Sequence, residues 1–523
     1  MATVAAAPER AKASPYAWYV LGVLFLVYVL NFIDRQILAI LADDIKRDLG
    51  LRDQDIGFLY GTAFGVFYAL FGIPLGRLAD NWRRVRLMSL GLALWSAMTA
   101  LSGFARTGGA LAGARVGVGI GEATASPAAY SLISDWFPKR LRATALAIYS
   151  SGIYVGGGCS LFIGGLIVQK WNLAYPDHSG PLGLVGWQAA FLAVGIPGLL
   201  VAILVATLRE PVRGQSEGLI APPHPAPLRA FLDELVTIIP PFTLIGAARG
   251  GGKALAANLV ALALIAGAVF ALVTLGEPLA QWAAIGIGAY AVISWAAALK
   301  RRDFPTWKLI AGNPAFLCIV VAYGLNAFMA YSVAAFAPSF ARRTFEIPPE
   351  ALGQMGFWIG APAALAGFLG ITLGGRIADA LRERSPVGRL HVVLFGCLAP
   401  VPAVVLAFTA KSPTIFYATI ALAQFLTCGA LGASAATTQD LVLPRMRGTA
   451  TAAFFIGTTL LGLALGPYLA GRISTLTGSL ATGVLALLAT LPLALAAIWG
   501  AYRLLPQAEA TKIERARAAG ERV

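Results

Sequence analysis

Four charged side chains lie deep inside apolar stretches of this chain: Asp34, Arg35, Arg115 and Glu122. A charged residue at the centre of a membrane helix costs about 3 kcal/mol on insertion scales, so these side chains should face one another or a water-filled cavity. Arg115 and Glu122 are seven residues apart, which places them on one helix face about 10 Å apart along the axis. We expect the Asp34 carboxylate to lie beside them. Such a group could carry a proton and bind an anion.

The proposed chemistry follows from how a buried ion pair responds to separation. A carboxylate that faces Arg115 stays ionised while the pair is intact, whereas removal from water disfavours its charge. If the pair separates, Asp34 or Glu122 can take up a proton, and Arg115 becomes available to an anionic group. We therefore predict that Asp34 and Glu122 couple protons and that Arg115 and Arg35 bind a head group or form an ion pair. Because adjacent residues point about 100° apart on a helix, one member of the Asp34–Arg35 pair could instead lock helices together.

The elements that must position these residues are membrane-spanning helices. The composition is 58% apolar and only 12% charged, against about 25% charged in soluble domains. The apolar residues recur in runs of about 20, twice the length of a barrel strand and without its alternation. We therefore predict an all-α polytopic membrane protein. The spans fall at 17–41, 56–79, 85–104, 108–134, 142–170 and 185–208, and again at 309–341, 351–379, 388–410, 413–440, 446–474 and 478–504.

The chain divides into three predicted regions. Residues 1–208 form an N-terminal six-helix bundle, 209–308 a central cytoplasmic connector, and 309–523 a C-terminal six-helix bundle with a cytoplasmic tail. The connector begins with a Pro-rich stretch at 221–225 and then contains two apolar stretches, joined by Gly276-Glu277-Pro278. We interpret 254–299 as a transmembrane hairpin, which gives fourteen spans. The alternative is a pair of helices lying on or beneath the membrane.

The net charge of +15 indicates orientation rather than a nucleic-acid partner, because Lys and Arg lie mostly in the short connectors. With the N-terminus in the cytoplasm, roughly 29 of the 40 Lys and Arg residues fall on the cytoplasmic side, as the positive-inside rule expects. Both termini are then cytoplasmic, and we expect a multi-pass protein of the bacterial inner (plasma) membrane. The four cysteines lie in apolar runs without a CxxC pair, so we expect no metal and no cofactor beyond protons as the coupling ion.

The two halves repeat each other. Gly76-Arg77-Leu78-Ala79-Asp80 returns as Gly375-Arg376-Ile377-Ala378-Asp379, and Tyr28-Val29-Leu30-Asn31 returns as Tyr323-Gly324-Leu325-Asn326. An even number of spans in each half gives both copies the same orientation, which is the parallel-repeat plan of a transporter. Extending the alignment pairs Asp34 with Met329, Arg35 with Ala330, and Glu122 with Thr427. The second half has no counterpart charge, which indicates a charged head-group and proton site on one wall and an apolar wall facing it.

The repeated G-x-L-A-D motif resembles the signature loop of the major facilitator superfamily, and the resemblance covers the chain outside the central connector. It implies two pseudo-symmetric six-helix bundles with alternating access to a central site, and we expect a monomer. The family's conformational latch would involve Gly76, Asp80, Arg84, Gly375 and Asp379, with Arg83 where a second glycine is usual. The resemblance, together with aromatic and polar stripes on the helices, suggests the cavity candidates Asn31, Tyr60, Phe64, Tyr149, Tyr154, Asn326, Met329, Gln424, Thr427 and Phe455.

Two strings resemble the Spinster group within that superfamily: Asn31-Phe32-Ile33-Asp34-Arg35 and Arg115-Val116-Gly117-Val118-Gly119-Ile120-Gly121-Glu122-Ala123. This resemblance implies a proton-coupled secondary active transporter of a lysophospholipid or sphingosine-phosphate type of amphiphile. One alternative is a proton-coupled importer of a hydrophilic organic acid. A membrane-embedded lipid-modifying enzyme would need a catalytic cluster near an interface, and the sequence shows no such set.

Overall fold

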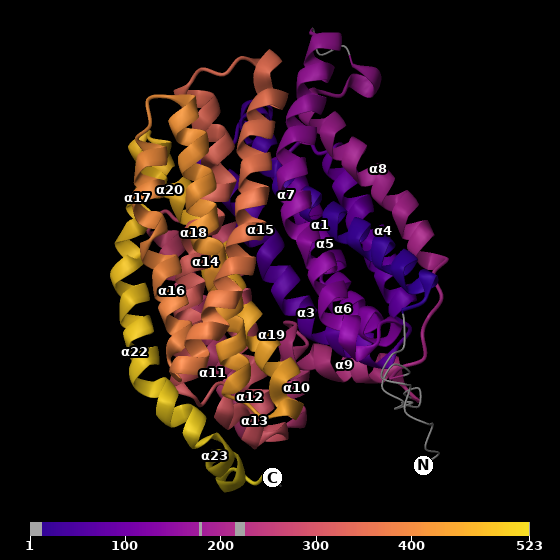
Figure 1. Ribbon diagram of the computed structural model, residues 1–523, viewed down its shortest axis with the longest axis vertical. Helices are drawn as coiled ribbons and strands as arrows, with labels where there is room; N and C mark the ends of the chain where they lie inside the picture. Colours follow the sequence, from indigo (N-terminus) through magenta and orange to yellow (C-terminus); the bar gives the residue numbers. More distant parts are fainter. Residues whose placement is uncertain (1–12, 177–179, 215–224, 522–523) are drawn as a thin grey trace. The chain divides into compact units, whose positions relative to one another are not determined.

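The computed structural model describes residues 13–521 except 177–179 and 215–224, and its helices can be followed in Figure 1. Across these ranges the secondary structure is helical, without a strand, so the all-α prediction is confirmed. Thirteen of the described helices are long and apolar enough to cross a membrane. Residues 221–224 of the predicted Pro-rich stretch lie outside the described residues.

All six predicted spans of the first half are helical. Their bounds are α1 (Pro15–Leu49), α2, η1 and α3 (Asp53–Gly57, Phe58–Thr62, Ala63–Asn81), α4 (Arg84–Ser102), α5 and α6 (Gly108–Glu122, Ala125–Trp136), α7 (Lys139–Ala174) and α8 (Gly186–Ala206). The fourth span is broken between α5 and α6, where the Thr124 hydroxyl donates to the Gly121 carbonyl (2.8 Å). Pro127 lies in the first turn of α6, where its missing N–H costs nothing. The number of candidate spans rises from thirteen to fourteen if the bent pair Pro227–Ile238 and Thr243–Arg249 is counted as one span.

The second half repeats this pattern. Its helices are α14 (Pro314–Thr344), η4 and α15 (Pro349–Ala351, Leu352–Arg384), α16 and α17 (Gly388–Leu398, Pro400–Phe408), α18 (Pro413–Asp440), η5, α19, η6 and α20 (Pro444–Met446, Arg447–Thr458, Thr459–Ala464, Gly466–Thr477), and α21, η7 and α22 (Leu480–Leu485, Ala486–Thr490, Leu491–Ala510). Pro400 separates α16 from α17 because proline cannot donate to the preceding turn. A short helix, α23 (Lys512–Ala518), follows α22 in the tail.

The central connector contains the predicted hairpin as α11 (Gly252–Thr274) and α12 (Leu279–Arg302), both long and apolar enough to span. Gly276 turns the chain between them with a φ of +88°, a conformation that glycine adopts without strain. The two helices differ in burial, because half of the α12 span is buried whereas Asn258 is the one buried residue of α11. Sequence analysis missed the short helices that flank the hairpin, namely α9 (Pro227–Ile238), α10 (Thr243–Arg249) and α13 (Phe304–Leu309).

By packing, the chain forms two units. The first contains Met1–Leu41, Phe71–Leu235 and Pro349–Gly360, and the second contains Ala42–Leu70, Val236–Pro348 and Ala361–Val523. The segment from Ala42 to Leu70 belongs to the second unit by its contacts, although the repeat assigns it to the first half. Packing and internal repeat therefore divide the chain differently, and the three predicted regions stay a prediction.

Candidate transport site

A buried ion pair joins two helices of the first unit. Arg35 on α1 donates from Nε to Oε2 of Glu122 on α5 at 2.6 Å. The Glu122 side chain is fully buried, whereas that of Arg35 is 17% exposed. The Arg35 guanidinium also lies over the Phe32 ring, 4.9 Å from its centroid. Arg35 is thus held by a carboxylate and an aromatic face, and it is the most exposed of the four predicted charged residues.

Asp34 and Arg115 complete the group in the same unit. Arg115 donates from Nη1 to the backbone carbonyl of Asp34 at 3.1 Å, and both residues are buried. The Glu122 carboxylate pairs with Arg35, one of the two arginines predicted to bind a head group or form an ion pair. Arg35 follows Asp34 by one residue, so its side chain leaves α1 about 100° away from that of Asp34. The structure brings all four residues together, and their roles stay predictions.

Two residues beside Asp34 were missed by sequence analysis. The side chains of Trp95 and Thr99 on α4 lie next to the Asp34 carboxyl, and both are buried. They are four residues apart in an apolar span, which places both on one helix face. The spacing of these two residues was the signal in the sequence that could have identified them. An aromatic residue in an apolar span is, however, equally typical of a packing role.

Close helix contacts hold this group in place. A Cβ on Gly156 of α7 would lie 2.4 Å from the Val29 carbonyl oxygen, and a Cβ on Gly121 of α5 would lie 2.8 Å from the Trp95 nitrogen. Only glycine fits at both positions, so α7 approaches α1 and α5 approaches α4 more closely than larger residues would allow. Ser160 of α7 also donates its hydroxyl to the Ile33 carbonyl at 2.8 Å. The backbone just before Asp34 is thereby fixed.

The remaining candidates of the first unit surround these contacts. Asn31 is buried one turn before Asp34. Tyr149 is fully buried and stacks on Tyr28 with ring centroids 4.2 Å apart, while Tyr154 is half-buried on the same helix. Tyr149 therefore packs α7 against α1, next to the charged group.

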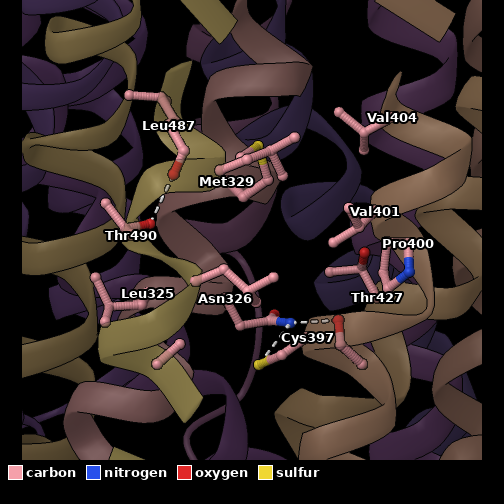
Figure 2. A pocket seen from close by; sticks show the side chains of 14 residues that line it. Leu325, Asn326, Met329, Cys397, Pro400, Val401, Val404, Thr427, Leu487 and Thr490 are labelled. Atoms are coloured by element: carbon pink, nitrogen blue, oxygen red, sulfur yellow. Dashed lines mark hydrogen bonds between the residues drawn. The ribbon is translucent and has the colours of Figure 1, made fainter. Parts of the chain in front are cut away.

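The second unit contains a small pocket that three predicted cavity residues line, namely Asn326, Met329 and Thr427 (Figure 2). Its volume is about 40 Å³. The Asn326 amide donates to the Gly396 carbonyl at 2.7 Å, and the Thr427 hydroxyl donates to the Ala423 carbonyl at 2.8 Å. Because both donors are used by the backbone, the pocket is mostly apolar. Its other lining residues are Leu325, Gly396, Cys397, Pro400, Val401, Val404, Leu487, Leu488, Thr490, Leu491 and Ala494.

Four other candidates in the second unit do not line this pocket. Tyr60 and Phe64 are buried, and Phe64 stacks on Tyr68 with centroids 5.5 Å apart. Gln424 donates to the sulfur of Cys428 on its own helix at 3.1 Å. Phe455 is 45% exposed. Among the described residues no group of three or more His, Cys, Asp or Glu side chains is placed to hold a metal ion.

Comparison with known proteins identifies the family. Residues 24–467 match the Major Facilitator Superfamily, which covers most of the chain. The chain belongs to the major facilitator superfamily. It is therefore a membrane transporter and not an enzyme, and the lipid-modifying enzyme is excluded.

Its relatives in the superfamily include an MFS-type efflux pump of Mycolicibacterium smegmatis, 30% identical over 88% of this chain and 84% of the pump. The protein Spinster of Drosophila melanogaster is 25% identical over 87% of this chain, and the match spans 62% of that longer protein. A solved bacterial homologue of the human lysosomal transporter Spinster, inward-facing and unoccupied, is 25% identical, with a TM-score of 0.65 over 97% of this chain and 96% of the homologue. This facilitator is thus Spinster-like, as its sequence strings predict.

The loop predicted to form the facilitator latch is organised by an arginine. Arg84 is fully buried and donates from Nε to Glu210 (2.8 Å), from Nη2 to the Pro211 carbonyl (2.9 Å), and from Nη1 to Asp135. Asp80 lies among the guanidinium groups of Arg213, Arg77 and Arg84. Arg83 has a φ of −69°, so the turn at this position does not require the usual glycine.

The repeat of this loop has the same central ion pair. Arg389 donates to Asp440 and, at 2.9 Å, to Asp379. Arg84 and Asp135 are both 305 positions before Arg389 and Asp440, so the two ion pairs are copies of each other. The two latch glycines have open surroundings, because a Cβ on Gly375 would meet nothing within 4 Å and one on Gly76 would meet only Pro127 at 3.9 Å. In each copy, ion pairs rather than a close backbone approach at the glycine organise the loop that is predicted to form the latch.

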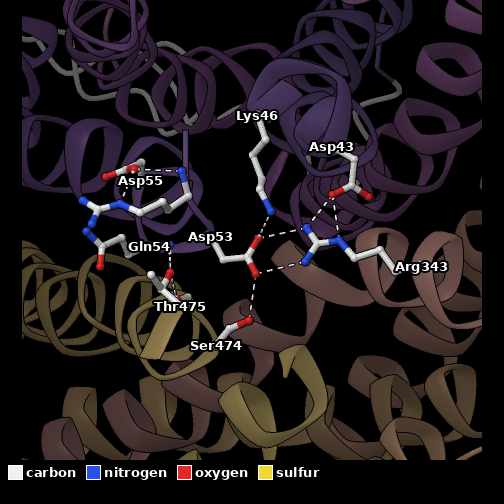
Figure 3. A network of polar contacts seen from close by, with 10 residues as sticks. Asp43, Lys46, Asp53, Gln54, Asp55, Arg343, Ser474 and Thr475 are labelled. Atoms are coloured by element: carbon white, nitrogen blue, oxygen red, sulfur yellow. Dashed lines mark hydrogen bonds and ion pairs between the residues drawn. The ribbon is translucent and has the colours of Figure 1, made fainter. Parts of the chain in front are cut away.

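A second charged network lies in the second unit, at the helix ends next to loop 50–52 (Figure 3). Asp53 of α2 accepts two hydrogen bonds from Arg343 of α14 (2.9 and 3.0 Å), one from Ser474 of α20 (2.7 Å), and another from Lys46. Arg343 also donates to Asp43 at 2.9 Å. Sequence analysis missed this network because charges at the ends of spans usually face water.

Proposed function

We propose that this facilitator is a secondary active transporter that works by alternating access and couples protons to the movement of an amphiphilic anion of the lysophospholipid or sphingosine-phosphate type. One observation carries the proposal. The positions of Asn31, Asp34 and Glu122 in the first half correspond to Asn326, Met329 and Thr427 in the second, and the latter three line an apolar pocket. A duplicated framework thus carries ionisable groups in one copy and an apolar lining in the other. An anion with a hydrocarbon tail matches both.

The proton step centres on Glu122. A proton on its carboxylate would break the pair with Arg35 and leave a guanidinium without its counter-charge in a buried place, which is costly. An anionic head group would restore the balance. Arg35 is the member best placed to receive it, because its side chain is the most exposed of the four. The anion should therefore bind more tightly as the pH falls.

The tail would occupy the pocket of the second half. At about 40 Å³ the pocket holds no more than a few water molecules, so an acyl chain must displace side chains to enter. Met329 is suited to this, because an unbranched thioether changes rotamer easily. The similarity to Spinster proteins also supports an amphiphile.

A hydrophilic organic acid is the second candidate substrate. The chain is 30% identical to a probable galactarate/D-glucarate transporter of Bacillus subtilis, over 38% of this chain and 42% of that transporter. Two guanidinium groups near one another, Arg35 and Arg115, would also suit a dianion. We place the protein in a bacterial plasma membrane as a monomer, with both termini in the cytoplasm, on the strength of the positive-inside bias.

Proteoliposomes with an imposed pH gradient test the proposal. Lysophosphatidylglycerol, sphingosine 1-phosphate and galactarate are offered separately, and uptake is followed for the parent, Glu122→Gln and Asp34→Asn. We expect gradient-driven movement of at least one lysolipid, reduced about 100-fold in Glu122→Gln. Glu350→Gln, a change on an exposed turn, is the matched control and should transport like the parent. Normal pH-dependent transport in both Glu122→Gln and Asp34→Asn would overturn the coupling scheme, and movement of galactarate alone would establish the second candidate.

A further inference from the structure

The tip of the hairpin is bound to a neighbouring span by its single carboxylate. Glu277 accepts a hydrogen bond from the Tyr468 hydroxyl (2.6 Å) and one from Arg472 Nε (3.1 Å), and both donors belong to α20. Trp282 of α12 donates its indole N–H to the same carboxylate at 3.1 Å. Hydrogen bonds to an ionised group are the stronger kind, and this carboxylate has three.

The chain of contacts continues from α20 to α2. Arg472 donates from Nη1 to the Gln54 side-chain oxygen at 3.0 Å, and the Gln54 backbone N–H donates to the Thr475 hydroxyl at 3.3 Å. Gln54 follows Asp53, the centre of the network in Figure 3, and Ser474 of that network follows Arg472 by two residues. The hairpin tip and the Asp53 network are therefore both linked by hydrogen bonds to the adjacent ends of α2 and α20.

Below the tip, α12 packs on both helices where each leaves α-helical geometry. The second span contains a π-helical turn, η1 (Phe58–Thr62), and the eleventh contains another, η6 (Thr459–Ala464). α12 contacts both turns, and a Cβ on Gly288 of α12 would lie 2.9 Å from Leu460. The turns also touch each other, because a Cβ on Gly61 would lie 2.1 Å from the Leu463 carbonyl oxygen. π-helical turns occur preferentially at functional places in helices.

We infer that the α11–α12 hairpin is a staple that holds the second and eleventh spans together at the end next to loop 50–52, and that this end opens only when Glu277 releases Tyr468 and Arg472. In the orientation proposed above this is the outer side, so the staple favours the state closed to the outside. The inference rests on the proposed alternating access, and it assigns to the connector a part in the transport cycle. The unequal burial of α11 and α12 agrees with it, since α12 is the more buried helix and packs on η1 and η6.

Thiol accessibility tests the staple without substrate or proton gradient. The reporter is Ser332→Cys on α14, a nearly isosteric change at a fully buried position against Gly466 of α20, in a background whose four native cysteines are replaced. A membrane-impermeant maleimide is added to intact cells. We expect Glu277→Gln to speed labelling about tenfold, because hydrogen bonds to a charged group are lost, and Tyr468→Phe to speed it by a smaller factor. Glu350→Gln should label at the parent's rate.

The outcomes separate the staple from the transport proposal. If the parent moves no lysolipid but Glu277→Gln still labels faster, the staple stands and the substrate is wrong. Labelling at the parent's rate in both Glu277→Gln and Tyr468→Phe would overturn the staple, whatever is transported. The thermal midpoint of each variant is measured alongside, and an equal rise in labelling for Glu350→Gln would also overturn it. Tyr468→Phe keeps the test usable if Glu277→Gln folds poorly, because it removes a single hydroxyl.

Discussion

The two halves of this transporter share a framework but differ at the positions where chemistry is expected. Arg84–Asp135 in the first half and Arg389–Asp440 in the second are the same ion pair at the same place in the repeat. By contrast, Glu122 forms an ion pair with Arg35 in the first half. Its counterpart in the second half, Thr427, donates a hydrogen bond to the Ala423 carbonyl of its own helix. Features common to both copies build the fold, and features present in one copy point to function.

Copying the second half into the first gives the largest expected effect. Glu122→Thr, which installs the residue found at position 427, takes the Glu122 carboxylate away from the partly buried Arg35, and removal of one partner of a buried pair costs about 3–5 kcal/mol. Adding Arg35→Ala, the counterpart of Ala330, removes the uncompensated charge and should restore most of the stability. PH-dependent transport should stay lost in the double variant. Thermal unfolding in detergent and flux in proteoliposomes measure the two properties.

The double variant is the informative one. Recovery of stability without recovery of transport would show that the pair is functional rather than structural. If instead Glu122→Thr alone unfolds no more easily than the parent, the Arg35–Glu122 pair contributes nothing to the fold and the distinction fails at its strongest point.

The shared ion pairs provide a second, smaller contrast. Arg84→Ala should cost about 3 kcal/mol, because the Arg84 side chain is fully buried and its removal takes a bound cation away from Asp135 and Glu210. Arg389→Ala should cost only about 1 kcal/mol, because Arg389 is 17% exposed and Arg382 remains 3.6 Å from Asp440. Thermal midpoints of the two variants, with Arg84→Lys as the control that keeps the charge, measure the difference. Equal losses of stability in Arg84→Ala and Arg389→Ala would mean that the different burial of the two arginines does not affect the free energy of unfolding.

The sequence alone predicts most of this fold because the bilayer imposes its own length scale. Runs of about 20 apolar residues identify every span, and the hairpin at 254–299 is found as α11 and α12. The break in the fourth span was missed, because Ala123 and Thr124 are as apolar or neutral as their neighbours. The short helices α9 and α10 were missed for the opposite reason, since neither is long enough to be recognised as a span.

The sequence predicts which residues form the candidate site better than it predicts which of them pair with one another. The cost of burying charge is enough to gather Asp34, Arg35, Arg115 and Glu122. The ion pair between Arg35 and Glu122 depends on how α1 is rotated about its axis, because the side chains of Asp34 and Arg35 leave the helix about 100° apart. The Asp53 network was out of reach, because its partners Arg343 and Ser474 are about 290 and 421 positions away in sequence, and Asp53 and Arg343 both lie outside the predicted spans.

The smallest expected effect concerns Arg445 in η5, which binds both the connector and the tail. It donates to Asp303 (2.7 Å) and to Glu521 (2.6 Å). Hydrogen bonding from Arg445 lowers the pKa of Asp303 to about 2, with further help from Thr306 and against the opposing effect of burial. A carboxyl with a depressed pKa contributes stability that is complete above its ordinary pKa and is lost as the pH falls through the depressed value.

The Asp303 contact should therefore contribute equally at pH 8 and pH 5 and weaken only below about pH 4. Asp303→Asn should lower the free energy of unfolding by a small, constant amount over the higher range, about 1 kcal/mol or less, because both members of the pair are partly exposed. The comparison sharpens here, because transport through the Glu122 site should change between pH 8 and pH 5 whereas this contact should not. Thermal scans of parent and Asp303→Asn at pH 8, 5 and 3.5 give the measurement. A difference that already shrinks between pH 8 and pH 5 would mean that Asp303 titrates in the working range, and that the second half also holds a proton-sensitive group.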